Sequence, residues 1–219
     1  MSKTVVQECR IVVADSVGGR ARGWVVSVGS LSGVLGSEEF CVTAVCGLTR
    51  EDVLSRLGVV HQESLPAYRM DNAVEHLGLD AWAVRLYAPS GAEWVYLFDV
   101  NGQTGVSHKR PVLKWLSEGT EAISVWSLIG STTHVTQARD GEVVATCSTW
   151  MFEPASGSDP DRLNGALERA GFFREGGTED DCDDALAALA AVEHEFGLEV
   201  EPGAVAGPLP TVIVPVQLL

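Results

Sequence analysis

The chain contains 219 residues, 46% of them hydrophobic and 21% charged, which is typical of a globular protein with a sizeable buried core. Its formal net charge is −15, and such a field repels nucleic acid and anionic membrane surfaces, so neither is expected as a partner. No apolar run approaches the roughly 20 residues that a transmembrane helix needs, and the first residues, MSKTVVQECR, lack the apolar core of a secretory signal.

Residues 1–37 contain two strand-like runs, VVQECRIVVAD and GWVVSVGS, separated by the loop SVGGRAR. Two apolar runs joined by a short glycine-containing loop predict an N-terminal β-hairpin extension. The stretch SLSGVLGSEE that follows is predicted to be a flexible link. Residues 38–219 are predicted to form a single α+β domain.

One helix and two strands are predicted next. GLTREDVLSRLG places Thr49 as a helix N-cap, with Asp52 three residues later. AWAVRLYA alternates between two faces, whereas EWVYLFDV is apolar on both faces and is therefore predicted to be a central strand. The segment Pro89–Ala92 is predicted to join these two strands as a hairpin loop.

The stretch DVNGQTGVSHKRP, Asp99 to Pro111, contains many side chains that could bind a ligand. It fits neither a Walker phosphate loop, which needs Gly-Lys followed by Ser or Thr, nor an EF-hand, whose glycine comes later and whose loop closes on an acidic residue. Asn101-Gly102 is a favourable turn, so a structural connector is the first interpretation. The alternative is a ligand-contacting loop in which His108, Lys109 and Arg110 meet an anion.

Three more strands are predicted at Ala122–Leu128, Thr132–Ala138 and Glu142–Trp150. Asp140-Gly141 between the last two is typical of a type I′ hairpin turn. A helix is predicted before them in KRPVLKWLSEG, and two after them, in SDPDRLNGALERAG and TEDDCDDALAALAAVEHEFG. The tail carries one short strand, Thr211–Val214. The predicted fold is therefore α+β: an antiparallel meander sheet of five or more strands with three to four packed helices.

Six residues are candidates for ligand binding. On TTHVTQA, His134 alternates with threonines, so one strand face is polar and carries an imidazole. Trp126 lies next to the polar residues Ser124 and Ser127, and is a candidate for the mouth of a pocket. The candidate ligand-binding residues are Asp99, Asn101, His108, Arg110, Trp126 and His134. A solvent-facing sheet surface is the simpler interpretation of the polar strand face.

The sequence contains no recognisable catalytic or metal-binding motif. Its five cysteines are an odd number without C-x-x-C spacing, which indicates reduced thiols in a cytoplasmic protein. The histidines form no H-E-x-x-H pair, and the acidic run DDCDD is explained by the preference of carboxylates for a helix N-terminus. No cofactor and no metal are expected, the catalytic residues stay unknown, and whether the protein is an enzyme is left open.

The charge is unevenly distributed along the chain. Residues 1–119 hold 11 Lys or Arg and 13 Asp or Glu, a net of −2, whereas residues 120–219 hold 4 and 17, a net of −13. The first functional hypothesis is therefore a non-enzymatic binding protein that engages a basic protein partner, as immunity and adaptor proteins do. The alternative is a small-molecule-binding protein or a biosynthetic enzyme with a pocket near Trp126, His134 and the 99–110 loop. The oligomeric state stays open.

Several motifs resemble one known family. FCVTAVCGLTREDVLSRLG, WVYLFDVNGQTG, RPVLKWLSEGTEAISVW and GSDPDRLNGAL follow the order found in the bacterial family named domain of unknown function 6461. The resemblance covers about residues 38–200, and the N-terminal hairpin departs from it. That family has no assigned activity, so the resemblance implies one continuous domain and gives no mechanism.

Overall fold

The computed structural model describes residues 30–35, 39–59, 64–128, 132–149, 153–173 and 184–215. The strands are β1 (Phe40–Cys46), β2 (Ala67–Tyr68), β3 (Ala83–Tyr87), β4 (Trp94–Asp99), β5 (Glu121–Ser127), β6 (Thr133–Arg139), β7 (Glu142–Ser148) and β8 (Leu209–Ile213). The helices are α1 (Leu31–Leu35), α2 (Arg50–Arg56), α3 (Met70–Leu77), α4 (Arg110–Leu116), α5 (Asp161–Arg169), α6 (Asp184–Phe196) and α7 (Pro202–Ala206), with a 3-10 turn η1 (Gly102–Thr104).

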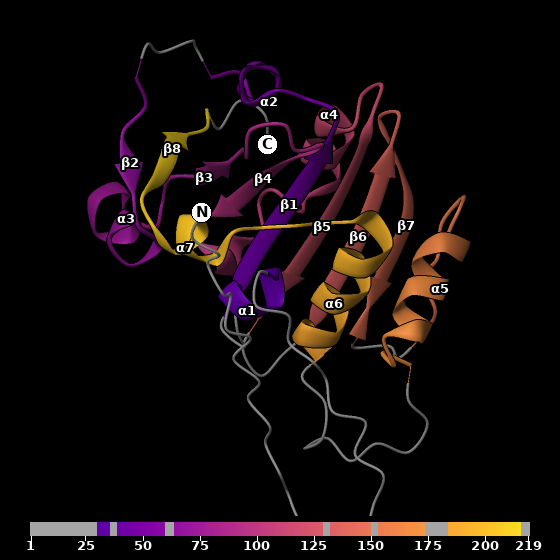
Figure 1. The fold of residues 1–219 in the computed structure, drawn as a ribbon. Coiled ribbons are helices and arrows are strands. Elements are labelled where there is room, and N and C mark those ends of the chain that lie inside the picture. The colour runs from indigo at the N-terminus through magenta and orange to yellow at the C-terminus, as the bar shows by residue number, and fades with distance from the viewer. Residues whose placement is uncertain are drawn as a thin grey trace, which may run out of the picture.

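The eight strands form one antiparallel sheet in the order β2-β8-β3-β4-β1-β5-β6-β7 (Figure 1). Only two parts of this order are hairpins between consecutive strands, β3-β4 and β5-β6-β7. Strand β1 lies between β4 and β5 and pairs with both. Its sequence FCVTAVC is apolar at nearly every position because both of its faces are covered.

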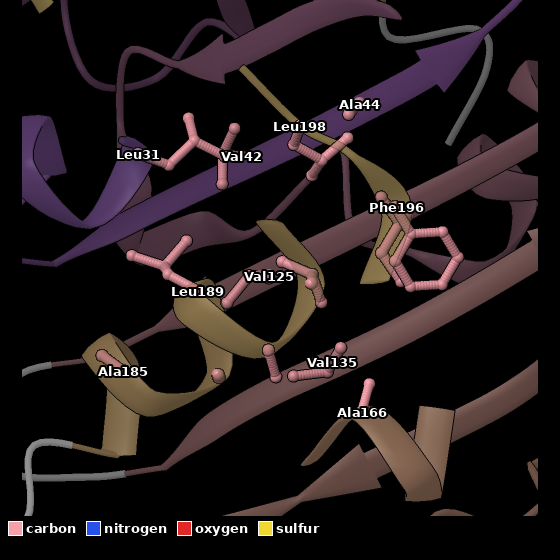
Figure 2. Packing of buried hydrophobic residues seen from close by; sticks show 14 of the residues in the cluster. Leu31, Val42, Ala44, Val125, Val135, Ala166, Ala185, Leu189, Phe196 and Leu198 are labelled. Atoms are coloured by element: carbon pink, nitrogen blue, oxygen red, sulfur yellow. The ribbon is translucent and has the colours of Figure 1, made fainter. Parts of the chain in front are cut away.

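The first face of the sheet is covered by helices from both ends of the chain. Figure 1 shows α6 lying across β5 and β6, with α5 beside it and α1 near the start of β1. Leu189 and Phe196 of α6 pack on Val125 and Val135 of the sheet, and Leu31 of α1 joins the same buried cluster (Figure 2). Burial of each large apolar side chain contributes about 1.5–3 kcal/mol, so this layer is a main source of stability.

The second face carries α2, α4 and the connection between β4 and α4. Val53 and Leu57 of α2, and Val112 and Leu116 of α4, belong to one buried cluster with the strand residues of that face. Helix α2 starts as expected, because Thr49 accepts a hydrogen bond from the Asp52 backbone N–H and Asp52 accepts one from that of Thr49. No helix in the described ranges is both long and apolar enough to cross a membrane.

The predicted α+β class and the antiparallel sheet are confirmed. The order is more complex than a meander, because β1 separates the β3-β4 hairpin from β5-β6-β7. The predicted flexible link is wrong for Leu31–Leu35, which form α1; the buried side chain of Leu31 holds this helix on the core. The helix predicted in SDPDRLNGALERAG is α5; it begins at Asp161, and Asp159 just before it pairs with Arg139. The predicted hairpin within 1–37 falls largely outside the described residues.

Candidate functional site

The second face of the sheet is organised in rows that run across neighbouring strands. Residues that pair directly across β1, β5, β6 and β7 form three such rows. They are an apolar row (Val45, Ala122, Ala138 and Val143), a hydroxyl row (Thr43, Ser124, Thr136 and Thr146) and an aromatic row (Cys41, Trp126, His134 and Ser148). Helix α4 covers the apolar row. Continuing the β1–β4 register places Asp99 beside Cys41, at the β4 end of the aromatic row.

The connection from β4 to α4, residues 100–109, lies over one half of the other two rows. Gly105, with φ of +52°, lies flat on the Trp126 indole, because a Cβ built there would stand 2.5 Å from two ring carbons. The Trp126 Nε1–H donates a 2.8 Å hydrogen bond to the carbonyl of Gly102. The β4–α4 connection is therefore fixed to β5 by one side chain.

Asp99, the last residue of β4, holds the same connection through hydrogen bonds. Its carboxylate is 3% exposed and accepts hydrogen bonds from the Ser107 backbone N–H at 3.0 Å and from Trp82 Nε1–H at 3.4 Å. Burial raises the pKa of Asp99 to about 6, although the hydrogen bonds from Ser107, Trp82 and Cys41 act in the opposite direction. Its role in the structure is to hold the turn at Ser107.

His108 inserts its imidazole into the hydroxyl row. Its Nδ1 lies 3.1 Å from the Ser124 hydroxyl and its Nε2 lies 3.1 Å from the Thr136 hydroxyl. A hydroxyl can donate or accept, so a neutral imidazole satisfies both contacts in either tautomer. Burial, with a smaller effect of His134, lowers the pKa of His108 to about 3. The ring is therefore neutral at physiological pH.

The remaining hydroxyls extend this network across four strands. Thr43 Oγ1 lies 2.8 Å from the Ser124 hydroxyl and 3.1 Å from the Ser107 hydroxyl, and it donates to one of them and accepts from the other. Ser107 Oγ lies 3.1 Å from the Cys41 thiol. At the other end, the hydroxyls of Thr136 and Thr146 lie 3.1 Å apart. Burial raises the pKa of the Cys41 thiol, so this sulfur is a protonated member of the network.

Trp126 and His134 form the outward-facing part of the aromatic row. Their ring centroids lie 5.1 Å apart at an interplanar angle of 20°, and His108 lies within 6 Å of both rings. Both side chains are half-buried, as is Ser148, whereas Thr146 is exposed. The His134 ring nitrogens make no hydrogen bond to any residue that the structure describes. We call Trp126, His134, Thr146 and Ser148 the open corner.

The six candidate residues do not all meet. His108, Trp126 and His134 lie together, and Asp99 reaches them through Ser107 and Thr43. Asn101 does not join them: its amide accepts from the Gln103 backbone N–H and donates to the Leu79 carbonyl, so it builds the turn. Arg110 is exposed at the first residue of α4.

Sequence reasoning missed Ser107, Thr43 and Thr146 as members of this network. Thr43 lies in an apolar run and Ser107 in a loop, where a single small polar residue carries no signal. The alternation of polar residues on β5 and β6 is visible in the sequence, and it places Ser124 and Thr136 on the same faces as Trp126 and His134. That alternation could have predicted the centre of the network.

The arrangement is suited to binding. The hydroxyls and both nitrogens of His108 are engaged with one another, and the Asp99 carboxylate is engaged with Ser107 and Trp82. Within the described ranges, no group of three or more His, Cys, Asp or Glu side chains is placed to hold a metal ion. The groups that face outward are the ring pair and the hydroxyls of the open corner.

Comparison with known families adds one finding to this geometry. Neither a curated protein nor a solved structure matches the chain. A family model matches residues 34–206, which include strands β1 to β7 and the whole open corner. The chain therefore belongs to the family described as "Family of unknown function (DUF6461)".

Proposed function

We propose that this protein is a non-enzymatic binding protein that holds a protein partner at its open corner, in the manner of an immunity or adaptor protein. The observation that supports this most is the inward engagement of the polar groups behind the corner. His108 has both nitrogens in hydrogen bonds, which leaves neither free to act as a base on a substrate. A network of this kind fixes the side chains above it, and preorganised side chains bind with a smaller entropy cost.

Charge supports a partner with basic groups. Beyond residue 120, every arginine in the described ranges pairs with a carboxylate of the same chain: Arg139 with Asp159, Arg162 with Glu121 and Glu195, and Arg169 with Glu195. These pairs leave the acidic surplus of the C-terminal half uncompensated. A surplus of one sign accelerates association with a partner of opposite charge and makes it sensitive to salt.

Capture from a lysate of the native cells tests the proposal. The full chain is immobilised at low and at high salt, beside the variant His134→Ala and the control His76→Ala. His76 is an exposed histidine on α3 that lies against Tyr68 with ring centroids 5.1 Å apart, near β2 at the opposite edge of the sheet. We expect a basic protein that is captured best at low salt and that only His134→Ala releases. Recovery of no partner at either salt would count decisively against the proposal.

A small-molecule ligand is the second candidate. It is favoured by the convergence of His108, Trp126 and His134 beside the 99–110 connection, because a few preorganised polar and aromatic groups are typical of ligand sites. A ligand that binds only the native state raises the melting temperature. A thermal-shift screen of nucleotides, acyl-CoAs, sugars and peptides tests this candidate. If none of these compounds raises the melting temperature, the candidate is contradicted.

A further inference from the structure

The ring pair in the open corner is a stack that ends at His134. Trp126 and His134 stand directly opposite each other on β5 and β6, and their centroid separation of 5.1 Å is close to the spacing of neighbouring strands. Nearly parallel rings at that separation face each other across the strands. One face of the indole is covered by Gly105 and the other by His134, so only the imidazole can continue the stack.

The next position in the same row is occupied by a small side chain. Ser148 of β7 pairs directly with His134, and Thr146, two residues earlier, presents an exposed hydroxyl on the same face. Strand β7 is the last strand of the sheet, and in the described part of the chain the segment after it pairs with β7 through one antiparallel bridge, Thr146 with Ser156. A third ring that continued the stack would therefore stand over Ser148, beside the Thr146 hydroxyl.

The chemistry of the corner favours an uncharged ring. The hydroxyl and aromatic rows contain no acidic residue. The nearest acid is Asp99, which continues the aromatic row on β4 and is buried beneath the 100–109 connection. An arginine placed there would lack the carboxylate that its guanidinium prefers, whereas a neutral aromatic ring needs none. Burial also lowers the pKa of His134, so the ring that receives the partner is neutral.

We propose that the open corner binds an aromatic side chain of the partner protein, which stacks on His134 above Ser148 and extends the Trp126–His134 pair. This inference rests on the proposed function, since it names the anchor that the partner supplies. Aromatic anchors are enriched among the residues that dominate protein interfaces. The acidic surplus steers the partner, and the ring then fixes its position.

Titration with short peptides, followed by NMR, tests the anchor directly. The probes are Ac-Gly-Trp-Gly-NH2, Ac-Gly-Arg-Gly-NH2 and Ac-Gly-Leu-Gly-NH2, and the signals are the His134 ring and the Ser148 amide. We expect the tryptophan peptide to shift both signals and to bind about two- to tenfold more tightly than the other two. His134→Ala abolishes the preference for tryptophan, and His76→Ala leaves it unchanged. Ser148→Leu, which fills the position over β7, abolishes it with the imidazole intact.

Each other result contradicts the inference in a distinct way. Equal binding of all three peptides, or binding that survives both corner variants, shows that no ring is received at His134. Tighter binding of the arginine peptide shows that the corner selects a cation. A partner that is captured from the lysate and released by His134→Ala, together with equal binding of the three peptides, keeps the proposed function and contradicts the aromatic anchor. If the tryptophan peptide is preferred at His134 but no partner is captured from the lysate, the aromatic site is supported and the protein partner is contradicted.

Discussion

Asp99 holds the connection that begins with it: its carboxylate accepts a 3.0 Å hydrogen bond from the backbone N–H of Ser107. The carboxylate is buried, and no basic side chain forms an ion pair with it in the part of the chain that the structure describes. A carboxylate in this position is ionised at neutral pH only at a cost in stability, because desolvation disfavours the charged form. Asp99 therefore links the position of the 100–109 connection to pH.

The first prediction concerns Asp99→Asn, which keeps an oxygen acceptor for Ser107 and removes the charge. The pKa of Asp99 is raised in the folded state from 3.8 to about 6. The protonated Asp99 carboxyl therefore stabilises the folded state. This stabilisation is complete below the pKa that the group has in the unfolded state, and it is lost as pH rises through about 6, the pKa in the folded state. We expect the wild-type free energy of unfolding to fall between pH 4 and pH 7 by on the order of 3 kcal/mol more than that of the variant.

Urea unfolding of both proteins across this pH range provides the measurement. Glu193, whose pKa is also raised by burial, titrates in both proteins, so the difference between them isolates Asp99. If the free energies of unfolding of the two proteins depended on pH in the same way, burial would not raise the pKa of Asp99.

The second prediction concerns His108. His108→Ala removes a partner from the Ser124 and Thr136 hydroxyls, both buried, and is expected to lower the free energy of unfolding by about 2–3 kcal/mol. His76→Ala, at an exposed site on α3, is expected to change it by less than about 0.5 kcal/mol. Denaturant unfolding of both variants provides the comparison, and equal losses would contradict a structural role for the imidazole.

The same residue makes a separate spectroscopic prediction. The pKa of His108 is lowered to about 3, so its ring nitrogens are expected to show no titration by NMR above about pH 5. A depressed histidine pKa contributes stability above the unfolded pKa and loses it as pH falls through the folded pKa. A titration midpoint near the ordinary value of 6.5 would mean that the His108 imidazole is not buried in solution.

The third prediction compares two glycines with similar backbones. Gly105 and Gly119 have φ of +52° and +63°, so alanine is strained by about 1 kcal/mol at either position. A Cβ at Gly105 also meets the Trp126 ring at 2.5 Å, whereas one at Gly119 meets nothing within 4 Å. We expect Gly105→Ala to cost about 1–3 kcal/mol more than Gly119→Ala and to change the tryptophan fluorescence. Equal costs would place the indole away from Gly105.

Much of the sheet could be predicted because its strands alternate. The two-residue turn Asp140-Gly141 forms as expected, with φ of +52° and +78° and with Arg139 directly opposite Glu142. The central strand β1 was not predicted, because FCVTAVC is apolar on both faces and, unlike β4, has no hairpin loop that joins it to a neighbouring strand. Helix α1 has only five residues, and its buried Leu31 is visible only in the fold.

The open corner could be predicted only in part, and β7 shows why. The Asp140-Gly141 turn alone would continue the pairing of Arg139 with Glu142 and place Thr146 opposite Val135, on the first face. The register shifts by one residue between Gln137 and Ala138, and Thr146 instead lies opposite Thr136. A shift of one residue exchanges the two faces of a strand, so this irregularity brings Thr146 and Ser148 to the corner.

The last prediction concerns Arg85. The alternating pattern of AWAVRLYA places Arg85 and Val84 on opposite faces of β3, but it does not indicate that Arg85 is buried. The side chain is 1% exposed, and it donates to the carbonyls of Tyr68, Val205 and Gly207 at 3.0, 2.9 and 2.7 Å. It therefore ties β2 and the end of α7 to the sheet. Burial lowers the pKa of this guanidinium to about 10, which leaves it charged at neutral pH.

Arg85→Met keeps an unbranched side chain in place of the aliphatic part of Arg85 and leaves three carbonyls without their donor, so we expect a loss of about 3 kcal/mol or more in the free energy of unfolding. Arg85→Lys restores one donor group and is expected to recover part of that loss, because an ammonium cannot reproduce the planar guanidinium geometry. Arg50→Met is the matched control, since Arg50 is exposed and its pair with Glu51 contributes at most about 1 kcal/mol. Chemical denaturation measures all three, and an Arg85→Met protein as stable as the Arg50→Met control would mean that the three carbonyls find other donors and that β2 and α7 do not depend on Arg85.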